Sequence, residues 1–296
     1  MRVVVTGAGG QTGSLVVQQL LERGVDTTAV VRTEGSKQKL AEQLGAQAAK
    51  LKIVLADVTD SKTLGTAFAG MDAAVVVTSA MPRLLKSSLL GVILAKVFTL
   101  GYVSRKPSFY FDEGQSPEIV DWMGQRDQID AAKTAGLKHV VLVSSMAGTK
   151  PDHFLNTQMD NIVLWKRKAE CYLVASGLPY TIIHPGGLLP HFGDRNPAPG
   201  GRRQLYVGID DSLMDDGQNH SSIPRGDVAA VCVASLFEPL AQGRSFDLGA
   251  GPEGEPYSLN LKDLLEPLQG ANAHYTKEQA EFKGGKKVRT CPCGEQ

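Results

Sequence analysis

A glycine-rich segment after the first apolar run is the feature that most limits how this chain can fold. Residues 6–13 read Thr-Gly-Ala-Gly-Gly-Gln-Thr-Gly, between the strand-like run Val3–Thr6 and a helical pattern near Gly13–Arg23. Glycines here let the backbone turn tightly, approach a diphosphate and pack the helix against the strand. The N–H groups that begin the helix then face the phosphates. The predicted contacts to a dinucleotide are Gly7, Gly9, Gly10, Gln11, Thr12 and Gly13.

Apolar runs alternate with amphipathic stretches over the first two thirds of the chain, which predicts repeated βα units. Most runs are continuously apolar, as in a parallel sheet that is buried on both faces. The expected strands are Val3–Thr6, Thr27–Arg32, Lys52–Leu55, Ala73–Thr78, His139–Ser144 and Tyr180–His184. The expected helices lie near Gly13–Arg23, Ser36–Leu44, Ser61–Ala69, Pro117–Ala135 and Asn161–Ser176. We therefore expect an α/β fold, a Rossmann-type doubly wound parallel sheet with right-handed crossovers.

After Pro185 the regular alternation stops. Residues 190–222 are rich in Gly, Pro, Asp and Asn and are expected to form a loop. A helix over Asp227–Phe237, capped by Asp227, a strand over Ser245–Leu248 and a helix near Leu259–Leu268 should follow. We expect a single domain over 1–276, with a core at 1–187, a small C-terminal substrate lobe at 188–276 and a flexible tail at 277–296.

The segment 81–117 is a long insertion after the carboxyl end of a central strand. Connections of this length usually carry function or disorder, and ligands of open α/β sheets bind at this edge. We therefore expect the insertion to form a lid over the substrate pocket.

Charge and hydropathy exclude several classes of protein. Lys plus Arg (31) balances Asp plus Glu (31), which argues against a protein built to bind nucleic acid. The longest apolar stretch, Leu89–Leu100, is short and contains Lys96, so no membrane span is expected. A strand pattern begins at once, without a leader pattern, which predicts a cytoplasmic protein. The alternative is a plastid protein whose transit peptide has been removed.

The four cysteines do not form a disulfide or metal pattern. Cys171 and Cys232 fall within apparent helices and are expected to be small buried residues. Cys291 and Cys293 lack the further ligands that a metal site needs, and we interpret them as part of the tail. The histidines show no metal-ligand spacing, so no metal is expected.

The residue that ends the second strand bears on cofactor choice. An acidic residue there usually binds the ribose hydroxyls of NAD, whereas a basic residue accommodates the 2′-phosphate of NADP. The residue here is Arg32, which predicts NADP (NADPH), unless Arg32 is merely solvated. Asp57 and Val58 should lie beside the adenine, although Asp57 could instead cap the helix at Ser61. The inner half of the cofactor should be lined by Thr78, Ser79 and Ala80.

Taken together, these segments resemble the short-chain dehydrogenase/reductase superfamily, over about residues 1–268 without much of 84–107. The likeness also rests on Ser144-Ser145, Lys166–Glu170 and Tyr180–Gly187. Asp121–Gln125, Trp165–Glu170 and Pro151–His153 resemble its atypical, NmrA-like branch, and within it a group of plant and algal NADP-binding proteins.

The resemblance implies a catalytic Ser, Tyr and Lys, with the tyrosine four residues before the lysine. Lys166 matches the lysine, with Glu170 one turn on as its expected i,i+4 partner. Ser145, or Ser144, matches the serine. The tyrosine position is Ile162, which cannot exchange a proton. That departure argues against ordinary interconversion of carbonyl and alcohol.

Further departures and substitutes bear on the same site. Asp121 stands where related enzymes carry an assisting asparagine, and Pro185-Gly186-Gly187 would place backbone groups, at Pro185 and Gly187, near the nicotinamide amide. Tyr110 in the insertion, His153 after the fifth strand or Lys166 itself could replace the tyrosine. Each residue could instead have another role. Tyr110 could serve in packing, His153 could be a turn residue, and Lys166 could simply bind the ribose.

Two functions fit this pattern. The first is an NADPH-dependent reductase of a quinone-like or other activated small molecule, whose substrate disperses charge and needs less help from an acid. The second is a non-catalytic NADP-binding redox sensor or assembly factor that acts through a protein partner, with Leu84–Leu100 as the docking surface.

Overall fold

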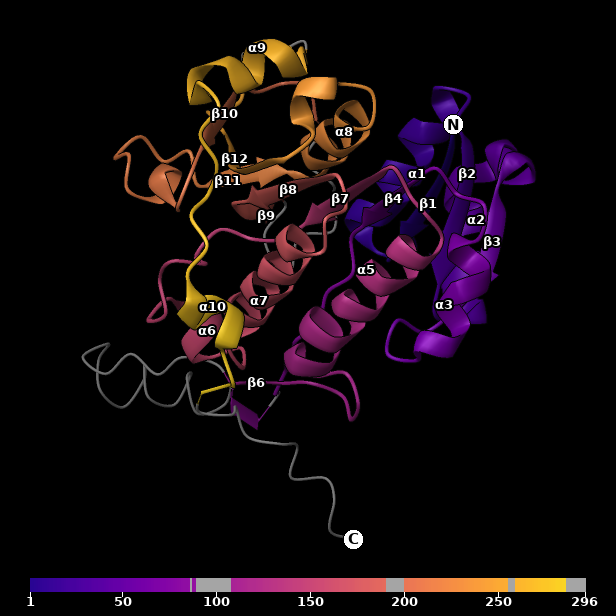
Figure 1. The fold of residues 1–296 in the computed structure, drawn as a ribbon, viewed down its shortest axis with the longest axis horizontal. Helices are drawn as coiled ribbons and strands as arrows, with labels where there is room; N and C mark the ends of the chain where they lie inside the picture. Colours follow the sequence, from indigo (N-terminus) through magenta and orange to yellow (C-terminus); the bar gives the residue numbers. More distant parts are fainter. Residues whose placement is uncertain (86, 89–107, 190–199, 255–258, 286–296) are drawn as a thin grey trace, which may run out of the picture.

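The computed structural model describes residues 1–85, 87–88, 108–189, 200–254 and 259–285. Eight strands form one sheet in the order β10-β12-β8-β7-β4-β1-β2-β3 (Figure 1). Seven run parallel, and β10 at the edge is antiparallel to β12. The strands are β1 (Arg2–Thr6), β2 (Asp26–Val31), β3 (Lys52–Leu55), β4 (Ala73–Val76), β7 (His139–Val143), β8 (Tyr180–Pro185), β10 (Leu205–Gly208) and β12 (Arg244–Ala250). The winding reverses between β1 and β4, which confirms the predicted doubly wound α/β fold.

Helices cover both faces of the sheet. One face is covered by α1 (Gln11–Glu22), α2 (Glu34–Leu44) and α8 (Arg225–Ser235), and the other by α3 (Ser61–Phe68), α5 (Gln125–Thr134) and α7 (Ile162–Ala175). The short elements are η1 (Gly45–Lys50), β5 (Arg83–Leu84), β6 (Phe109–Tyr110), η2 (Glu118–Gly124), α6 (Phe154–Thr157), β9 (Gly187–Leu189), η3 (Ser212–Met214), β11 (Ser222–Pro224), η4 (Pro239–Ala241), α9 (Leu261–Leu265), η5 (Glu266–Leu268) and α10 (Lys277–Glu281).

The continuous apolar runs of the sequence are explained by burial on both faces. In β1, Val3 and Val5 pack in the core under α1, α2 and α8, whereas Val4 packs in the core under α3, α5 and α7. All three side chains are fully buried. Because successive strand residues point to opposite faces, a strand with helices on both sides needs apolar residues at every position.

Some elements differ from the sequence-based expectations. The helix expected over Pro117–Ala135 begins as a π-helix, η2, before it becomes α5. The helix α8 begins at Arg225 after Pro224, so the expectation that Asp227 caps it was wrong. Asp227 lies in the first turn instead, where its carboxylate accepts a hydrogen bond from the backbone N–H of Gly201 at 2.6 Å.

Residues 188–276, expected as a substrate lobe, contribute two strands to the main sheet. These strands are β12, which pairs with β8, and the edge strand β10, which the sequence did not reveal. The helix α8 of this range packs along α1. The remaining small sheet, β9 with β11, is parallel and leaves the main sheet directly after β8.

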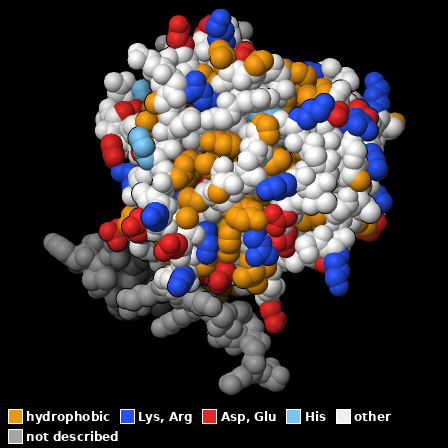
Figure 2. Space-filling view, in the orientation of Figure 1, with side chains coloured by type: hydrophobic (Ala, Val, Ile, Leu, Met, Phe, Trp, Pro, Cys, Tyr) orange, Lys and Arg blue, Asp and Glu red, His pale blue; other side chains and the backbone are white. Residues whose placement is uncertain are grey.

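The segment expected as a flexible tail begins with a helix. α10 packs on α7, and a capping box between Thr276 and Gln279 starts it. Beyond it, Phe282 lies edge-on to Trp165 at 4.7 Å between ring centroids, and its carbonyl accepts a hydrogen bond from Lys168 Nζ at 2.7 Å. Figure 2 shows hydrophobic side chains gathered over this side of the molecule, among both basic and acidic groups.

Other expectations are settled by burial or lie beyond the described residues. Cys171 and Cys232 are buried, as expected. Cys291, Cys293 and most of the Leu84–Leu100 surface lie outside the described residues. In the described part of the insertion, β5 pairs antiparallel with β6. None of the helices in the described ranges is long and apolar enough to cross a bilayer.

Candidate dinucleotide site

The glycine-rich turn between β1 and α1 has the geometry that a diphosphate requires. Gly7 has φ +71°, and a Cβ on it would lie 2.7 Å from the carbonyl oxygen of Val77. A Cβ on Gly13 would lie 2.2 Å from the carbonyl oxygen of Gly7, so the helix can pack this closely only as glycine. Gly10 is the N-cap of α1, and no side chain in the described part of the chain caps that helix start. A Cβ on Gly10 would lie 3.2 Å from the carbonyl oxygen of Gly7. The unfilled N–H groups of a helix start suit the approach of a phosphate.

The turn meets the end of β2, because the backbone N–H of Ala8 donates to the carbonyl oxygen of Val30 at 3.2 Å. A Cβ on Gly9 would lie 3.0 Å from Cβ of Ser36, so the turn packs on the start of α2. Arg32 is exposed and donates a hydrogen bond to the side-chain oxygen of Gln115. Val58 lies against η2, because a Cβ on Gly124 would be 3.1 Å from its carbonyl oxygen.

Asp57 does not cap the next helix. Its Oδ1 accepts hydrogen bonds from the N–H and hydroxyl of Thr59, at 2.9 and 2.8 Å. The cap of α3 is Asp60, which accepts from the N–H of Lys62 at 3.1 Å. The alternative interpretation of Asp57 as a helix cap was therefore wrong, and its place beside an adenine remains a prediction.

The segment after β4 is fixed by side chains from α5 and η2. Gln125 Nε2 donates to the carbonyl oxygen of Thr78 at 3.1 Å, and Gln128 Nε2 donates to its hydroxyl at 3.2 Å. The backbone N–H of Ala80 donates to Asp121 Oδ2 at 2.9 Å. Ser79 hydrogen-bonds within its own turn. These contacts hold the carboxyl end of β4 beside the glycine-rich turn after β1.

Lys166 is buried in an ion pair with Asp121, with 2.7 Å between Nζ and Oδ1. The two side chains are 7% and 0% exposed. The expected pairing of Lys166 with Glu170 was wrong, because Glu170 binds other partners. Asp121 reaches the lysine from η2, a wide helical turn of a kind often found at functional sites. The sequence aligned Asp121 with the family's asparagine but did not reveal this contact.

The two serines after β7 have different surroundings. Ser144 is buried and its hydroxyl donates to Glu170. Ser145 is half-buried and donates to the carbonyl of Met146 at 2.9 Å. Ile162, in the tyrosine position, is buried in an apolar cluster with Ala80 and other residues. An apolar wall thus replaces a phenol one helical turn before Lys166.

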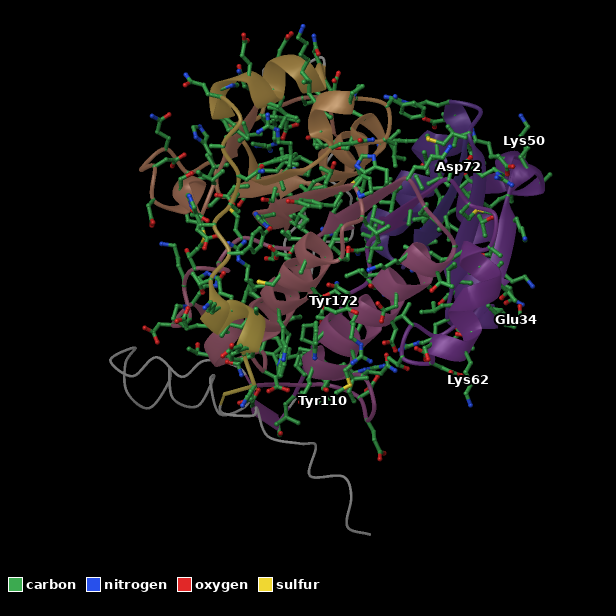
Figure 3. The ribbon with its side chains drawn as sticks, viewed as in Figure 1. Glu34, Lys50, Lys62, Asp72, Tyr110 and Tyr172 are labelled. Carbon is green, nitrogen blue, oxygen red and sulfur yellow. The ribbon has the colours of Figure 1, made fainter. Side chains whose placement is uncertain are left out.

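The two other candidates for a proton donor, Tyr110 and His153, lie in a short strand and at a helix start. Tyr110 is in β6, paired in register with Arg83, at the end of the molecule where α7 begins (Figure 3). His153 Nδ1 accepts a hydrogen bond from the N–H of Leu155 and so caps α6. Burial, and to a lesser degree Lys150, lowers the pKa of His153 against the opposing effect of Asp211. The cap uses Nδ1 as an acceptor, whereas a role of His153 as general acid stays a prediction.

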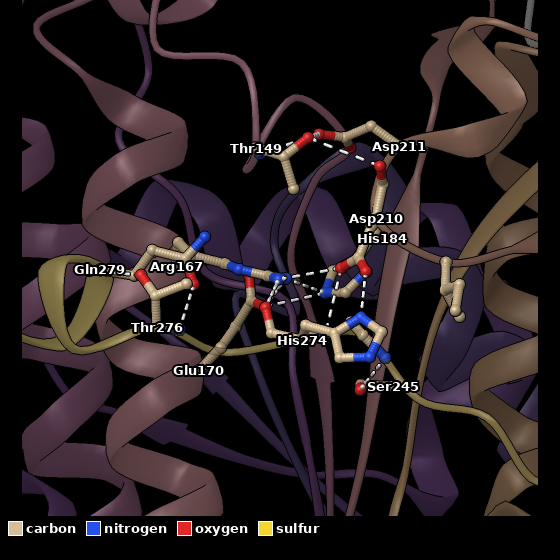
Figure 4. A network of polar contacts seen from close by, with 12 residues as sticks. Thr149, Arg167, Glu170, His184, Asp210, Asp211, Ser245, His274, Thr276 and Gln279 are labelled. Carbon is tan, nitrogen blue, oxygen red and sulfur yellow. Dashed lines mark hydrogen bonds and ion pairs between the residues drawn. The ribbon is translucent and has the colours of Figure 1, made fainter.

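Behind Ser144, four charged side chains form a buried network, of which Figure 4 shows Glu170, Arg167 and His184. Glu170 Oε2 lies 3.0 Å from Arg167 Nη1 and 2.8 Å from His184 Nε2, and His184 Nδ1 lies 3.4 Å from Asp247 Oδ1. Burial alone would raise the pKa of Glu170, but the charges of His184 and Arg167 lower it to about 2. Burial would likewise lower the pKa of His184, but Glu170 raises it to about 9. A sequence signal for this network was available: His184 and Asp247 each interrupt a strand that is otherwise mostly apolar.

The turn after β8 completes the site. A Cβ on Gly186 would lie 2.3 Å from the carbonyl oxygen of Ser221, and the N–H of Gly187 donates to that oxygen at 2.7 Å. The carbonyl of Pro185 accepts a hydrogen bond from the N–H of Met146 at 3.1 Å. The chain therefore turns out of the sheet here, next to the serine loop. Roles for Pro185 and Gly187 near a nicotinamide stay predictions.

Within the described ranges, no three His, Cys, Asp or Glu residues gather as metal ligands.

The chain is similar to a plant reductase, to an uncharacterized plant protein and to a bacterial protein of known structure. It is 43% identical to sanguinarine reductase of Eschscholzia californica, with 86% of this chain and 90% of the relative covered. It is 42% identical to an uncharacterized chloroplastic protein of Arabidopsis thaliana, over 86% of this chain and 71% of the relative. Among solved structures, a Bacillus halodurans protein described as an NAD-dependent epimerase/dehydratase is 26% identical, with a TM-score of 0.62, over 86% of this chain and 96% of its own.

A family model for NAD(P)H-binding matches residues 7–239, from the glycine-rich turn to the end of α8 and beyond. This match confirms the resemblance to the NmrA-like branch of the short-chain dehydrogenases/reductases. The site geometry agrees with it, because the turn, the ends of β2 and β4 and the buried Lys166 all meet at one edge of the sheet. The chain therefore belongs to the NAD(P)H-binding family.

Proposed function

We propose that the protein is an NADPH-dependent reductase of a small, electron-poor acceptor that is quinone-like or otherwise activated. The observation that carries the proposal is the buried pair of Lys166 and Asp121, one helical turn from the apolar Ile162. The lysine of the family's catalytic set is present and held in place, whereas its proton-donating tyrosine is missing. An acceptor that disperses negative charge over a conjugated system needs no phenol beside it.

The residues of the site then have distinct tasks. The cofactor, when bound, supplies a hydride. The turn from Gly7 to Gly13 binds its diphosphate, and Arg32 binds its 2′-phosphate. Lys166, oriented by Asp121, binds the nicotinamide ribose. With a quinone as the acceptor, Ser145 donates a hydrogen bond to the acceptor oxygen, which takes a proton from water after the hydride has been transferred.

The relatives support a reductase and suggest acceptors to test. Sanguinarine reductase is similar along nearly its whole length, so sanguinarine belongs with a set of quinones as candidate acceptors. Two relatives of Arabidopsis thaliana, 42% and 30% identical, are described as chloroplastic, which favours the plastid alternative over the cytoplasmic expectation. We propose a plastid location on that ground.

The test is oxidation of NADPH, followed by its absorbance, with sanguinarine and the quinones one at a time. Lys166→Ala should lower kcat/KM by about a hundredfold, because the ribose loses its anchor and the acceptor its alignment. Lys168→Ala is the matched control, because Lys168 lies on the same helix but bonds to the carbonyl of Phe282. Equal activity of wild type and Lys166→Ala would refute the role of Lys166.

A second candidate function is a non-catalytic NADP-binding sensor or assembly factor. The burial of Ile162 within an apolar cluster favours it, because the residue in the family's tyrosine position cannot exchange a proton. Tight NADPH binding with no oxidation by any acceptor would support the sensor and exclude the reductase.

A further inference from the structure

We propose that Gln115 is a positioning residue for cofactor choice, which holds the Arg32 guanidinium at the 2′-phosphate subsite without neutralising it. The inference rests on the proposed function, in which Arg32 binds that phosphate. Gln115 comes from the far end of the insertion, and the sequence motifs gave no indication of its role.

The contact joins two distant parts of the chain at the adenosine end of the site. Arg32 follows β2, Gln115 precedes η2 by a few residues, and Nη1 of the arginine donates to Oε1 of the glutamine. Directly beside them, Thr33 Oγ1 caps α2 and lies 2.9 Å from Ser36 Oγ. The glycine-rich turn packs on the same point, because a Cβ on Gly9 would be 3.0 Å from Cβ of Ser36. The glycine-rich turn and the start of α2 thus pack together directly after Arg32 in the chain, where the proposed function places the 2′-phosphate.

The carboxamide of Gln115 suits this role better than a carboxylate would. A guanidinium on an exposed side chain has many rotamers, and a partner that fixes one of them lowers the entropic cost of binding. A carboxylate would fix it too, but it would also form a charge-assisted pair and oppose a phosphate dianion. A carboxamide orients Arg32 and leaves its charge available. The next basic residue, Lys37, is paired with Glu34 at 3.3 Å.

The segment that carries Gln115 also contacts the other end of the site. Phe109 lies edge-on to Phe154 at 6.2 Å between ring centroids, and Phe111 packs against the apolar cluster that contains Ile162. One stretch of the insertion thus spans the site from the Ile162 cluster to Arg32. Gln115 fixes its adenosine end.

The experiment measures the dissociation constants of NADPH and NADH by calorimetry for the wild type and three variants. Gln115→Glu should raise the dissociation constant of NADPH about tenfold, because the new carboxylate competes with the 2′-phosphate for Arg32. The dissociation constant of NADH, which lacks that phosphate, should change by less than about twofold. Gln115→Ala should weaken NADPH about threefold. Gln38→Glu places the same charge on an exposed position of α2 and should leave both constants unchanged.

A double variant tests whether Gln115 acts through the arginine. In an Arg32→Ala background, Gln115→Glu should cause no further loss of NADPH affinity. Thermal melting of each variant checks that it folds. A wild type that prefers NADPH, together with a Gln115→Glu variant that keeps that preference, would overturn this inference alone. A wild type that binds neither cofactor would overturn the proposed function as well.

Discussion

Asp121 shows how one buried carboxylate can fix three elements at a site. Its Oδ1 binds Lys166 on α7, its Oδ2 accepts the N–H of Ala80 after β4, and its own backbone belongs to η2. A buried ion is stable only when a counter-charge and hydrogen bonds replace water. The side chain is fully buried, so either partner would be left as an uncompensated charge if the other were removed.

We expect Asp121→Asn to lower the free energy of unfolding by about 3 kcal/mol, because Lys166 would then be a buried cation without its counter-ion. Lys166→Met should lower the free energy of unfolding by a similar amount, because Asp121 would then be a buried anion without its counter-ion. The double variant should lose less than the sum of the two, and urea denaturation of all four proteins measures this coupling. Strict additivity would show that the two side chains do not interact in solution.

The loop after β7 is held in a strained conformation by the carboxylate of Asp211, which is distant in sequence. Ala147 has φ +78°, which is unfavourable for a residue with a Cβ. Asp211 accepts hydrogen bonds from the N–H groups of Ala147 and Thr149, at 2.6 and 2.8 Å, and from the Thr149 hydroxyl at 2.6 Å (Figure 4). This contact fixes the loop that carries Ser145.

Replacing Asp211 should release that loop. We expect Asp211→Ala to cost about 3 kcal/mol of unfolding free energy, because two backbone N–H groups lose their acceptor. Asp211→Asn keeps one acceptor oxygen and should cost less. Hydrogen exchange should show faster exchange at Ala147 and Thr149 in Asp211→Ala than in wild type. Unchanged exchange at these two amides would contradict the clamp.

At the scale of the whole molecule, the buried network connects the sheet to the C-terminal segment. Glu170 and Arg167 lie on α7, while His184 and Asp247 lie on the neighbouring strands β8 and β12. Arg167 Nη2 also donates to the carbonyl of His274 at 2.7 Å, and its guanidinium stacks over the Tyr275 ring. The end of the described chain is therefore attached to the core by the same charges that meet between the strands.

This network predicts how stability depends on pH. The pKa of His184 is raised to about 9 in the folded protein, so its stabilising contribution is full below its unfolded value near 6.5 and is lost as pH rises to about 9. The loss should be roughly 3 kcal/mol at most, and the lowered pKa of Glu170 expresses the same interaction and is not added. Urea denaturation across this range should show the slope in wild type.

The control for this pH dependence is His184→Gln, which cannot carry the charge. Its stability should be lower at pH 6.5 and nearly flat up to pH 9. His139, whose pKa burial lowers to about 4, affects stability only below pH 6.5 and so lies outside the measured window. Parallel curves for wild type and variant would show that His184 is not charged in the folded protein.

The sequence predicted local features well because local patterns determine them. The glycine-rich turn, the parallel strands and most helices followed from apolar periodicity and position-specific glycines. Several short elements were not predicted, among them the edge strand β10, which lies between polar segments, and α10, which has only five residues. The π-helical form of η2, within an expected helix, depends on packing against its neighbours. The capping box of α10, Thr276 to Gln279, was a readable signal.

Contacts between distant residues could not be predicted from one sequence. The partner of Lys166 was expected on its own helix, at Glu170, because i,i+4 spacing is a local rule. The folded chain instead brings Asp121 to the lysine and leaves Glu170 to His184. The link between Arg32 and Gln115 likewise crosses a long insertion. Such pairs depend on how the elements pack, which apolar patterning alone does not specify.

The packing of α8 on α1 has a consequence for synthesis on the ribosome. The apolar side of α1, with Val16 and Leu20, is covered in part by a helix that is translated roughly 200 residues later. At ordinary elongation rates, about 10 to 40 seconds separate the two events. During that interval we expect the apolar side of α1 to lack part of its cover, so a chaperone that binds exposed apolar helices could bind it there.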